Sequence, residues 1–185
     1  MKAFFRYIFL NIVTVFTVTM FFSCKGDNLE EVRRMSEYRQ VPVGEASNFE
    51  LRYTDSLELR AIVKGKVYRD FTNQDFPYQE FPEGVRVDYF SETGDTSTVT
   101  ANYGVIYSNT KLIDLQGDVN LITSDGKHLQ SPQLYFDQVN NWIFTEKDFE
   151  FTSQDYDMTG TGIDFNKDFT QVRFRGKKGS AVLKE

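Results

Sequence analysis

Few residues in this chain have the types and spacing that catalysis requires. His128 is the only histidine and Cys24 the only cysteine among 185 residues, so a Ser-His-Asp triad or a histidine-based metal cluster lacks its other members. The sequence "GTG" at residues 160–162 lacks the third glycine of a dinucleotide fingerprint, and no G-x-x-x-x-G-K-[ST] phosphate loop occurs. The sequence therefore predicts a protein that is not an enzyme and that uses no metal or cofactor.

Cys24 stands where an apolar run ends and a charged stretch begins. Residues 1–23 contain Lys2 and Arg6 but no acid, and residues 7–22 are mostly apolar, which is typical of a secretory signal. As a helix, residues 7–22 would measure about 24 Å, which is less than the roughly 30 Å of a bilayer core. The sequence "FFSC" at residues 21–24 resembles the lipobox of bacterial lipoproteins, in which the signal is cut before a lipidated cysteine. The alternative is a short, uncleaved membrane anchor.

The rest of the chain divides into a linker and one domain. Residues 24–46 are polar with scattered apolar residues, and we interpret them as a spacer. Residues 47–185 are enough for one domain with a sizeable core. The net charge of −6 becomes more negative once Lys2 and Arg6 are removed, which argues against nucleic acid as a partner and against a basic membrane-surface patch.

Apolar residues in the domain alternate with polar ones, as in half-buried antiparallel strands. The alternating sets are Leu57, Leu59, Ala61 and Val63; Val85, Val87 and Tyr89; Val99, Ala101, Tyr103, Val105 and Tyr107; and Ile113, Leu115, Gly117, Val119 and Leu121. Polar turns separate them. Pro77 and Pro82 interrupt the pattern in "FTNQDFPYQEFPEG", which predicts a loop or an irregular edge at residues 71–84. The domain is expected to be all-β.

A strand-turn-strand unit also repeats along the chain. The segments "ANYGVIY", "LQSPQLY" and "TGTGIDF" end at Tyr107, Tyr135 and Phe165, a spacing of about 30 residues of the kind that builds sandwiches, rolls or solenoids. Each is followed by a polar turn and a second alternating strand.

Together these segments resemble the LptC family of lipopolysaccharide export proteins and the related LptA/OstA-like jellyroll domains. The resemblance is carried by "LRAIVKGKVY", "VRVDYF", "TANYGVIYSNTKLIDLQGDVNLITSDGKHLQSPQLYFD" and "MTGTGIDFNKDFTQVRFRG", and it extends from about residue 47 to residue 183. Familiar members have a true transmembrane helix as anchor, whereas this chain looks like a lipoprotein.

The resemblance implies an antiparallel, twisted β-jellyroll that is an open roll with an apolar interior. It also implies a periplasmic protein on the inner membrane that takes lipopolysaccharide from an ABC transporter and passes it to the next domain of a bridge. Side chains that would line a groove for the lipid A acyl chains are Leu59, Ala61, Val63, Val87, Tyr89, Val99, Ala101, Val105, Ile113, Leu115, Val119, Leu121, Phe144, Phe149, Phe151, Ile163 and Phe174. Each residue taken singly is also compatible with an ordinary core position.

Partner proteins are expected at the open sheet edges, because unpaired backbone donors and acceptors can pair with another strand. The candidate edges are residues 48–53 and residues 172–182. The alternative function is that of a structural lipoprotein of the cell envelope, a β-sandwich with a dry core that binds only protein.

Overall fold

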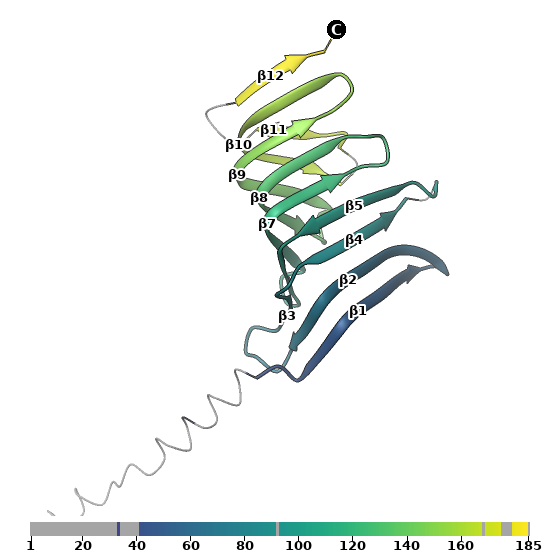
Figure 1. The fold of residues 1–185 in the computed structure, drawn as a ribbon, viewed down its shortest axis with the longest axis vertical. Coiled ribbons are helices and arrows are strands. Elements are labelled where there is room, and N and C mark those ends of the chain that lie inside the picture. The colour runs from purple at the N-terminus through teal and green to yellow at the C-terminus, as the bar shows by residue number, and fades with distance from the viewer. Residues whose placement is uncertain (1–32, 34–40, 92, 168, 175–178, 185) are drawn as a thin grey trace, which may run out of the picture. The chain divides into compact units, whose positions relative to one another are not determined.

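The computed structural model describes residue 33 and residues 41–91, 93–167, 169–174 and 179–184 (Figure 1). One compact unit spans residues 40–185. Its strands are β1 (Gly44–Asp55), β2 (Glu58–Phe71), β3 (Tyr78–Phe81), β4 (Val85–Phe90), β5 (Thr96–Ala101), β6 (Tyr103–Tyr107), β7 (Leu112–Ile122), β8 (His128–Asp137), β9 (Trp142–Thr152), β10 (Tyr156–Asn166), β11 (Val172–Phe174) and β12 (Gly179–Leu183). Their pairings are antiparallel, which confirms the predicted all-β jellyroll.

The sheet forks at its long strands. Because β1 occupies one edge of β2, the other edge pairs with both β4, through residues 61–65, and β3, through residues 69–71. In the same way, β8 occupies one edge of β7, and the other edge pairs with β6 through residues 112–116 and with β5 through residues 120–122. The long strands therefore continue from one layer of the roll into the other.

We call the two layers the β5 layer and the β6 layer, after two short strands that each belong to one layer only. The β5 layer contains β4, β5 and β12 with residues 49–55, 58–65, 119–122, 128–130, 149–152 and 156–160. The β6 layer contains β3, β6 and β11 with residues 44–47, 67–71, 112–116, 133–137, 142–145 and 163–166. The hydrophobic core lies between the inner faces of these layers.

The strands bend where pairing shifts from one layer to the other. Shifts in register fall between Gln116 and Val119 in β7, and between Thr161 and Ile163 in β10. Gly117 allows the bend in β7, since its φ of 73° is in the left-handed region and a Cβ there would lie 3.0 Å from Asn102 Cβ.

Two buried hydroxyls satisfy backbone groups at the bends of β8 and β9. Ser131 Oγ lies 2.9 Å from the carbonyl oxygens of both Gln133 and Asp148, and 3.2 Å from Thr145 Oγ1. Thr145 Oγ1 accepts a hydrogen bond from Lys147 N at 3.0 Å. These contacts replace part of the main-chain pairing that the bends interrupt.

The repeated unit corresponds to three hairpins of the roll. They are formed by β6 and β7, by β8 and β9, and by β10 and β11. Their turns contain Lys111, Asn141 and Phe169, each with φ between 53° and 57°. Each copy of the sequence repeat thus corresponds to one hairpin.

Two details of the predicted strands are wrong. Residues 99–107 form two strands rather than one, because Asn102 N donates a hydrogen bond to Gly117 O at 2.8 Å where the chain passes from the β5 layer to the β6 layer. The side chains of Ala101 and Tyr103 consequently lie on opposite faces of the roll's wall. The loop or irregular edge predicted at residues 71–84 also contains strand β3, which pairs on both sides, with β2 and with β6. Its register with β6 runs from Tyr78, opposite Tyr107, to Phe81, opposite Gly104.

Candidate lipid-binding face

A row of apolar side chains crosses the inner face of the β5 layer. Directly paired residues in neighbouring strands point to the same face of a sheet. Successive pairings join Leu51, Val63, Val87, Val99, Leu121, Leu129, Phe151 and Met158. From Val63 onward, these side chains belong to the hydrophobic core cluster or pack against it.

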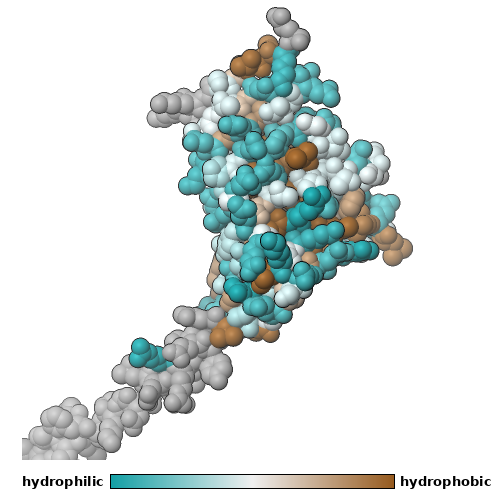
Figure 2. All heavy atoms as spheres, in the orientation of Figure 1, coloured by the Kyte–Doolittle hydropathy of each residue, from teal (hydrophilic) through white to brown (hydrophobic). Residues whose placement is uncertain are grey.

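Exposure changes steeply along this row. Leu51, at the β1 end, is 50% exposed, whereas Leu129 is 1% exposed and Phe151 is 3% exposed. Tyr53, Leu59 and Tyr89 lie on the same inner face near the β1–β2 and β4–β5 hairpins and are also exposed. Figure 2 shows hydrophobic residues at the surface where the β1–β2 hairpin ends. The apolar interior is therefore open at its amino-terminal half and closed at its carboxyl-terminal half.

The closed half is filled by side chains from the β6 layer. Pairing in that layer joins Ile106, Ile113, Phe136, Ile143, Phe165 and Val172 into an opposing row. Phe165 is 1% exposed and stacks on Phe169 at 4.5 Å between ring centroids. The two rows occupy the space between the layers across β7 to β10.

An aromatic cluster closes the open half on the side of the bends. The rings of Phe49 and Tyr68 stack at 4.3 Å, and Phe81 contacts both of them at 5.9 Å and 5.5 Å between centroids. Gly65 leaves room for Phe81, because a Cβ at Gly65 would lie 2.6 Å from Phe81 Cδ1. The opening consequently lies toward the hairpin tips rather than toward the bends.

The outer face of the β5 layer is polar. Arg86 pairs with Asp88 at 2.8 Å, and Thr98 donates a hydrogen bond to Asp88 at 2.9 Å. The hydrogen bond from Arg86, together with that from Thr98, holds the pKa of Asp88 below its usual range. The two faces of this layer thus differ sharply in chemistry, as a sheet with one face toward an apolar interior requires.

The structure brings most of the predicted groove residues to this interior. Those on the inner face of the β5 layer are Leu59, Ala61, Val63, Val87, Tyr89, Val99, Ala101, Val119, Leu121, Phe149 and Phe151. Ile113, Leu115 and Ile163 lie on the inner face of the β6 layer. Their contact with lipid stays a prediction.

Two of the predicted groove residues lie on another face, and the side chain of a third is not described. Val105 pairs with Asp114, and Phe144 stacks on Tyr135 at 5.1 Å, so both lie on the outer face of the β6 layer. The alternation of residues 99–107 did not reveal that the chain changes layer at Asn102. Phe174 pairs with Ile163 through its backbone, and its side chain is not among the described parts. Cys24 lies outside the described residues.

Several residues of the interior were not predicted from the sequence. Leu51 and Tyr53 alternate with polar neighbours in "FELRYTD", and Leu129 and Leu134 lie in "HLQSPQLY". Alternation in the first segment is a signal that would have identified Leu51 and Tyr53. In the second segment, simple alternation does not identify the residues that face the interior. The bend at Ser131 shifts the alternation, so Leu129 and Leu134 both face the interior although they are out of phase in the sequence.

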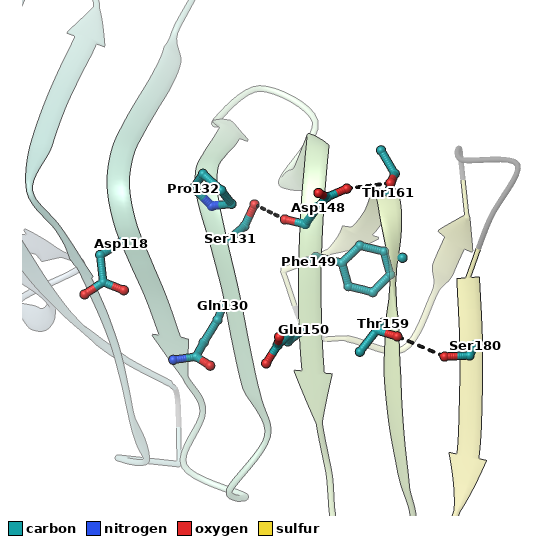
Figure 3. A pocket seen from close by; sticks show the side chains of 11 residues that line it. Asp118, Gln130, Ser131, Pro132, Asp148, Phe149, Glu150, Thr159, Thr161 and Ser180 are labelled. Carbon is teal, nitrogen blue, oxygen red and sulfur yellow. Dashed lines mark hydrogen bonds between the residues drawn. The ribbon is translucent and has the colours of Figure 1, made fainter.

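The hollow of about 780 Å³ shown in Figure 3 has a different chemistry. It lies outside the bends of β8, β9 and β10, and polar groups such as Asp118, Asp148 and Glu150 line it. Thr161 donates a hydrogen bond to Asp148 at 2.6 Å, so part of this polar surface is already satisfied internally. Such a surface does not suit acyl chains.

The described residues contain no group of three or more His, Cys, Asp or Glu side chains that could hold a metal ion. His128 begins β8, where its Nε2 lies 3.0 Å from Asn120 Oδ1. The arrangement therefore offers a surface for apolar groups and, in its described part, no metal-binding cluster.

The family model for lipopolysaccharide-assembly, LptC-related proteins matches residues 50–179. The chain belongs to the LptC family, and the resemblance noted in the sequence is confirmed. A search of the curated proteins found no match.

Membership places the chain in a non-enzymatic family of the cell envelope that takes part in lipopolysaccharide transport. Its members are inner-membrane-associated periplasmic proteins. Within the part that the structure describes, no helix has the length and hydrophobicity that a membrane span needs.

Because one half of the interior is open and the other is closed, truncating a side chain should lower the free energy of unfolding by different amounts at the two ends of the apolar row on the β5 layer. Leu129→Ala should lower the free energy of unfolding by about 2–5 kcal/mol, because it leaves a cavity in the closed half. Leu51→Ala should cost less than about 1 kcal/mol, since Leu51 is half exposed. Urea denaturation of both variants measures the two costs, and equal costs would contradict an open amino-terminal half.

Proposed function

We propose that the protein receives lipopolysaccharide from an inner-membrane ABC transporter and passes it along the inner face of the β5 layer to the next domain of a periplasmic bridge. The observation that supports this role is the exposed apolar surface at Leu51, Tyr53, Leu59 and Tyr89, which continues into the buried row between the layers. Contiguous exposed apolar surface on a soluble domain typically marks a site of interaction.

Acyl chains gain stability on such a surface by leaving water. Each Å² of apolar surface removed from water contributes about 25 cal/mol, so a chain that lies against several of these side chains is held without any directional bond. The lack of directional bonds also allows the chain to slide between neighbouring positions. The sugars and phosphates of the headgroup stay in solvent outside the hairpin tips.

Passage through the closed half requires the two layers to separate. The side chains of Leu121, Leu129 and Phe151 now occupy that space, being 4%, 1% and 3% exposed. An acyl chain that enters replaces side-chain contacts with lipid contacts of the same apolar kind, so the free energy of the exchange is small compared with that of exposing either to water. The transporter supplies the direction of movement.

Open edges at both ends of the sheet are suited to partners. Among the described strands, β1 pairs only with β2, and β11 and β12 pair only with β10. The other edges of these strands offer backbone donors and acceptors for strand addition. In this proposal the transporter side docks at β1 and the next bridge domain docks at β11 and β12.

Cys24 is the proposed point of attachment to the inner membrane. A diacylglycerol on its sulfur, together with a further acyl chain, would hold the domain stably, since one chain alone anchors only marginally. The residues between Cys24 and β1 act as the spacer between the membrane and the roll.

One observation favours a second function, that of a structural envelope lipoprotein that binds only protein. The carboxyl-terminal half of the interior is packed as a dry core would be, with Val119, Ile163 and Phe165 each 1% exposed. Under this alternative the apolar surface near β1 contacts another protein rather than lipid.

Photocrosslinking in cells distinguishes the two functions. A photoreactive residue at Val87, on the inner face of β4, should form an adduct with lipopolysaccharide. The same residue at Arg86, on the outer face of the same strand, should form none. Immunoblotting for lipopolysaccharide on the purified protein reads both positions. Adducts at neither position, with folded protein in both cases, would support the structural lipoprotein.

Deletion of residues 172–185 tests the docking edge. The shortened protein should lose capture of the next bridge domain in a pull-down, because β11 and β12 are gone. It should keep the Val87 adduct, because the amino-terminal half is intact. A cooperative thermal transition controls for folding, and retained capture of the bridge domain would refute docking at this edge.

Cys24→Ser tests the anchor. The variant should lose incorporation of labelled palmitate and should accumulate with its first 23 residues attached, because the signal is cut only before a lipidated cysteine. Mass spectrometry of the protein from membrane and soluble fractions measures both effects. An unchanged mass and unchanged membrane association would indicate an uncleaved anchor.

A further inference from the structure

The turn between β10 and β11 places an aromatic ring between the two layers. Phe169, in this turn, stacks on Phe165 of the β6 layer at 4.5 Å between ring centroids. The same ring lies 6.1 Å from that of Phe151, on the inner face of the β5 layer. Phe165 and Phe151 each stand next to the last residue of their strand, close to the hairpin tips. Phe169 therefore bridges the opening between the layers at the hairpin tips, which we call the mouth.

The inward direction of this ring distinguishes it from the turns of the other two repeated hairpins. Lys111 and Asn141 also have φ between 53° and 57°, but their side chains are exposed. Phe169 has a φ of 55° and packs against the hydrophobic core. A bulky side chain is disfavoured in this left-handed region, where glycine or asparagine would cost less free energy. The ring at position 169 is therefore explained by its contacts with the interior and not by the needs of the turn.

A second side chain of the same turn reaches across the mouth. The ammonium group of Lys167 lies 6.0 Å from the centroid of the Tyr89 ring. Tyr89 is 40% exposed on the inner face of β4, in the open half of the interior. At this distance the quadrupole of the ring attracts a cation. The turn thus touches the β5 layer at two places, through Lys167 at the open half and through Phe169 at the closed half.

Hydrogen bonds within the β6 layer hold the turn in place. Gln171 N donates a hydrogen bond to Asn166 Oδ1 at 2.8 Å, which closes the turn on itself. Lys167 N donates another to Asn141 O at 3.0 Å, in the neighbouring turn of the same layer. The contacts of Lys167 and Phe169 with the β5 layer, by contrast, are made by side chains. These side chains can therefore leave the β5 layer without breaking the hydrogen bonds that shape the turn.

The ring of Phe169 stands in the way of an acyl chain that enters the closed half. Phe151 belongs to the apolar row of the β5 layer, and Phe165 belongs to the opposing row of the β6 layer. A chain that moves along the first row from Val87 toward Phe151 consequently meets Phe169 between the rows. Replacing the ring by an acyl chain exchanges one apolar contact for another, so the exchange costs little free energy.

We propose that Phe169 is a gate residue at the mouth of the roll and that Lys167 helps to hold this gate closed through Tyr89. In the structure the gate is closed. An incoming acyl chain takes the place of the Phe169 ring, and the two layers can then separate. This inference rests on the proposed passage of lipopolysaccharide and names the side chains that control it.

Photocrosslinking of the full-length protein in cells tests the gate. One photoreactive residue replaces Val87, in the open half, and another replaces Met158, which stands opposite Phe151 behind the gate. A methionine site suits this purpose because its flexible side chain tolerates substitution. The quantity measured is the ratio of the lipopolysaccharide adduct at Met158 to the adduct at Val87, each normalised to the amount of protein.

Phe169→Ala should raise this ratio by about fivefold if the gate is open in roughly a fifth of wild-type molecules, because occupancy behind the gate scales with the open fraction. Phe169→Leu should restore most of the wild-type ratio, since an apolar side chain again fills the space. Phe144→Ala is the matched control, a truncated aromatic ring on the outer face of the same layer, and it should leave the ratio unchanged. Thermal unfolding of the purified variants verifies that they are folded.

Lys167→Met is a second test, because this exposed side chain can be changed without removing a core contact. It keeps the length of the side chain and removes the charge, so it should raise the ratio by about twofold, as expected for a lost cation–ring contact at an exposed site. Lys111→Met, in the turn between β6 and β7, removes an exposed lysine from the same layer and should have no effect.

The results separate a failed gate from a failed function. Adducts at Val87 with an unchanged ratio in both Phe169→Ala and Lys167→Met would overturn the gate and leave the proposed passage of lipopolysaccharide standing. An equal rise in Phe144→Ala would overturn it too, because the rise would then reflect general loosening of the roll. Adducts at neither position in any variant would contradict the proposed function, and the gate with it.

Discussion

Strand β7 pairs along a single edge with two different partners, β6 through residues 112–116 and β5 through residues 120–122, and the rest of the roll depends on this division. A backbone donor or acceptor that is buried without a partner costs free energy comparable to that of a lost hydrogen bond. A long strand that bends between two layers must therefore find a new partner in each. Gly117 permits the bend, and Ser131 and Thr145 supply hydrogen bonds at the corresponding bends of the next strands. Strands β2 and β10 likewise each have two different partners, one in each layer, so the fork recurs along the roll.

The fork also creates the interior and sets its profile. Where β7 to β10 cross between the layers, opposing apolar rows meet and fill the space. Nearer to β1, the β5 layer extends to the β1–β2 and β4–β5 hairpins, and side chains such as Leu51 and Tyr89 remain exposed on its inner face. A uniform sandwich would bury both halves alike. In the proposed function, the exposed half near β1 is the entrance to an apolar path, and the packed half lies further along that path.

The outer faces of the two layers differ in chemistry, although both inner faces are apolar. The β5 layer presents polar pairs such as Arg86 and Asp88 to solvent. The β6 layer presents Tyr103, Tyr107 and Phe144 together with Glu80 and Asp164. Aromatic and β-branched residues are favoured on any pleated surface, so composition alone does not distinguish an inner face from an aromatic outer one. The loop before β3 adds Phe76 to this outer face, where its ring centroid lies 5.5 Å from that of Tyr107.

Local pattern in the sequence was enough to determine the class of fold, the family, the hairpin repeat and most of the interior. Period-two alternation reports which side chains share a face, and that relation is fixed within each strand. Tertiary structure alone decided which face is inside after a bend. Val105 continues the alternation of Ala101 in the sequence but lies on the opposite side of the wall, because the chain changes layers at Asn102. It also decided that Leu51 is exposed and Leu129 is buried. Exposure depends on which side chains of the other layer lie opposite each residue, and those side chains come from segments far apart in the chain.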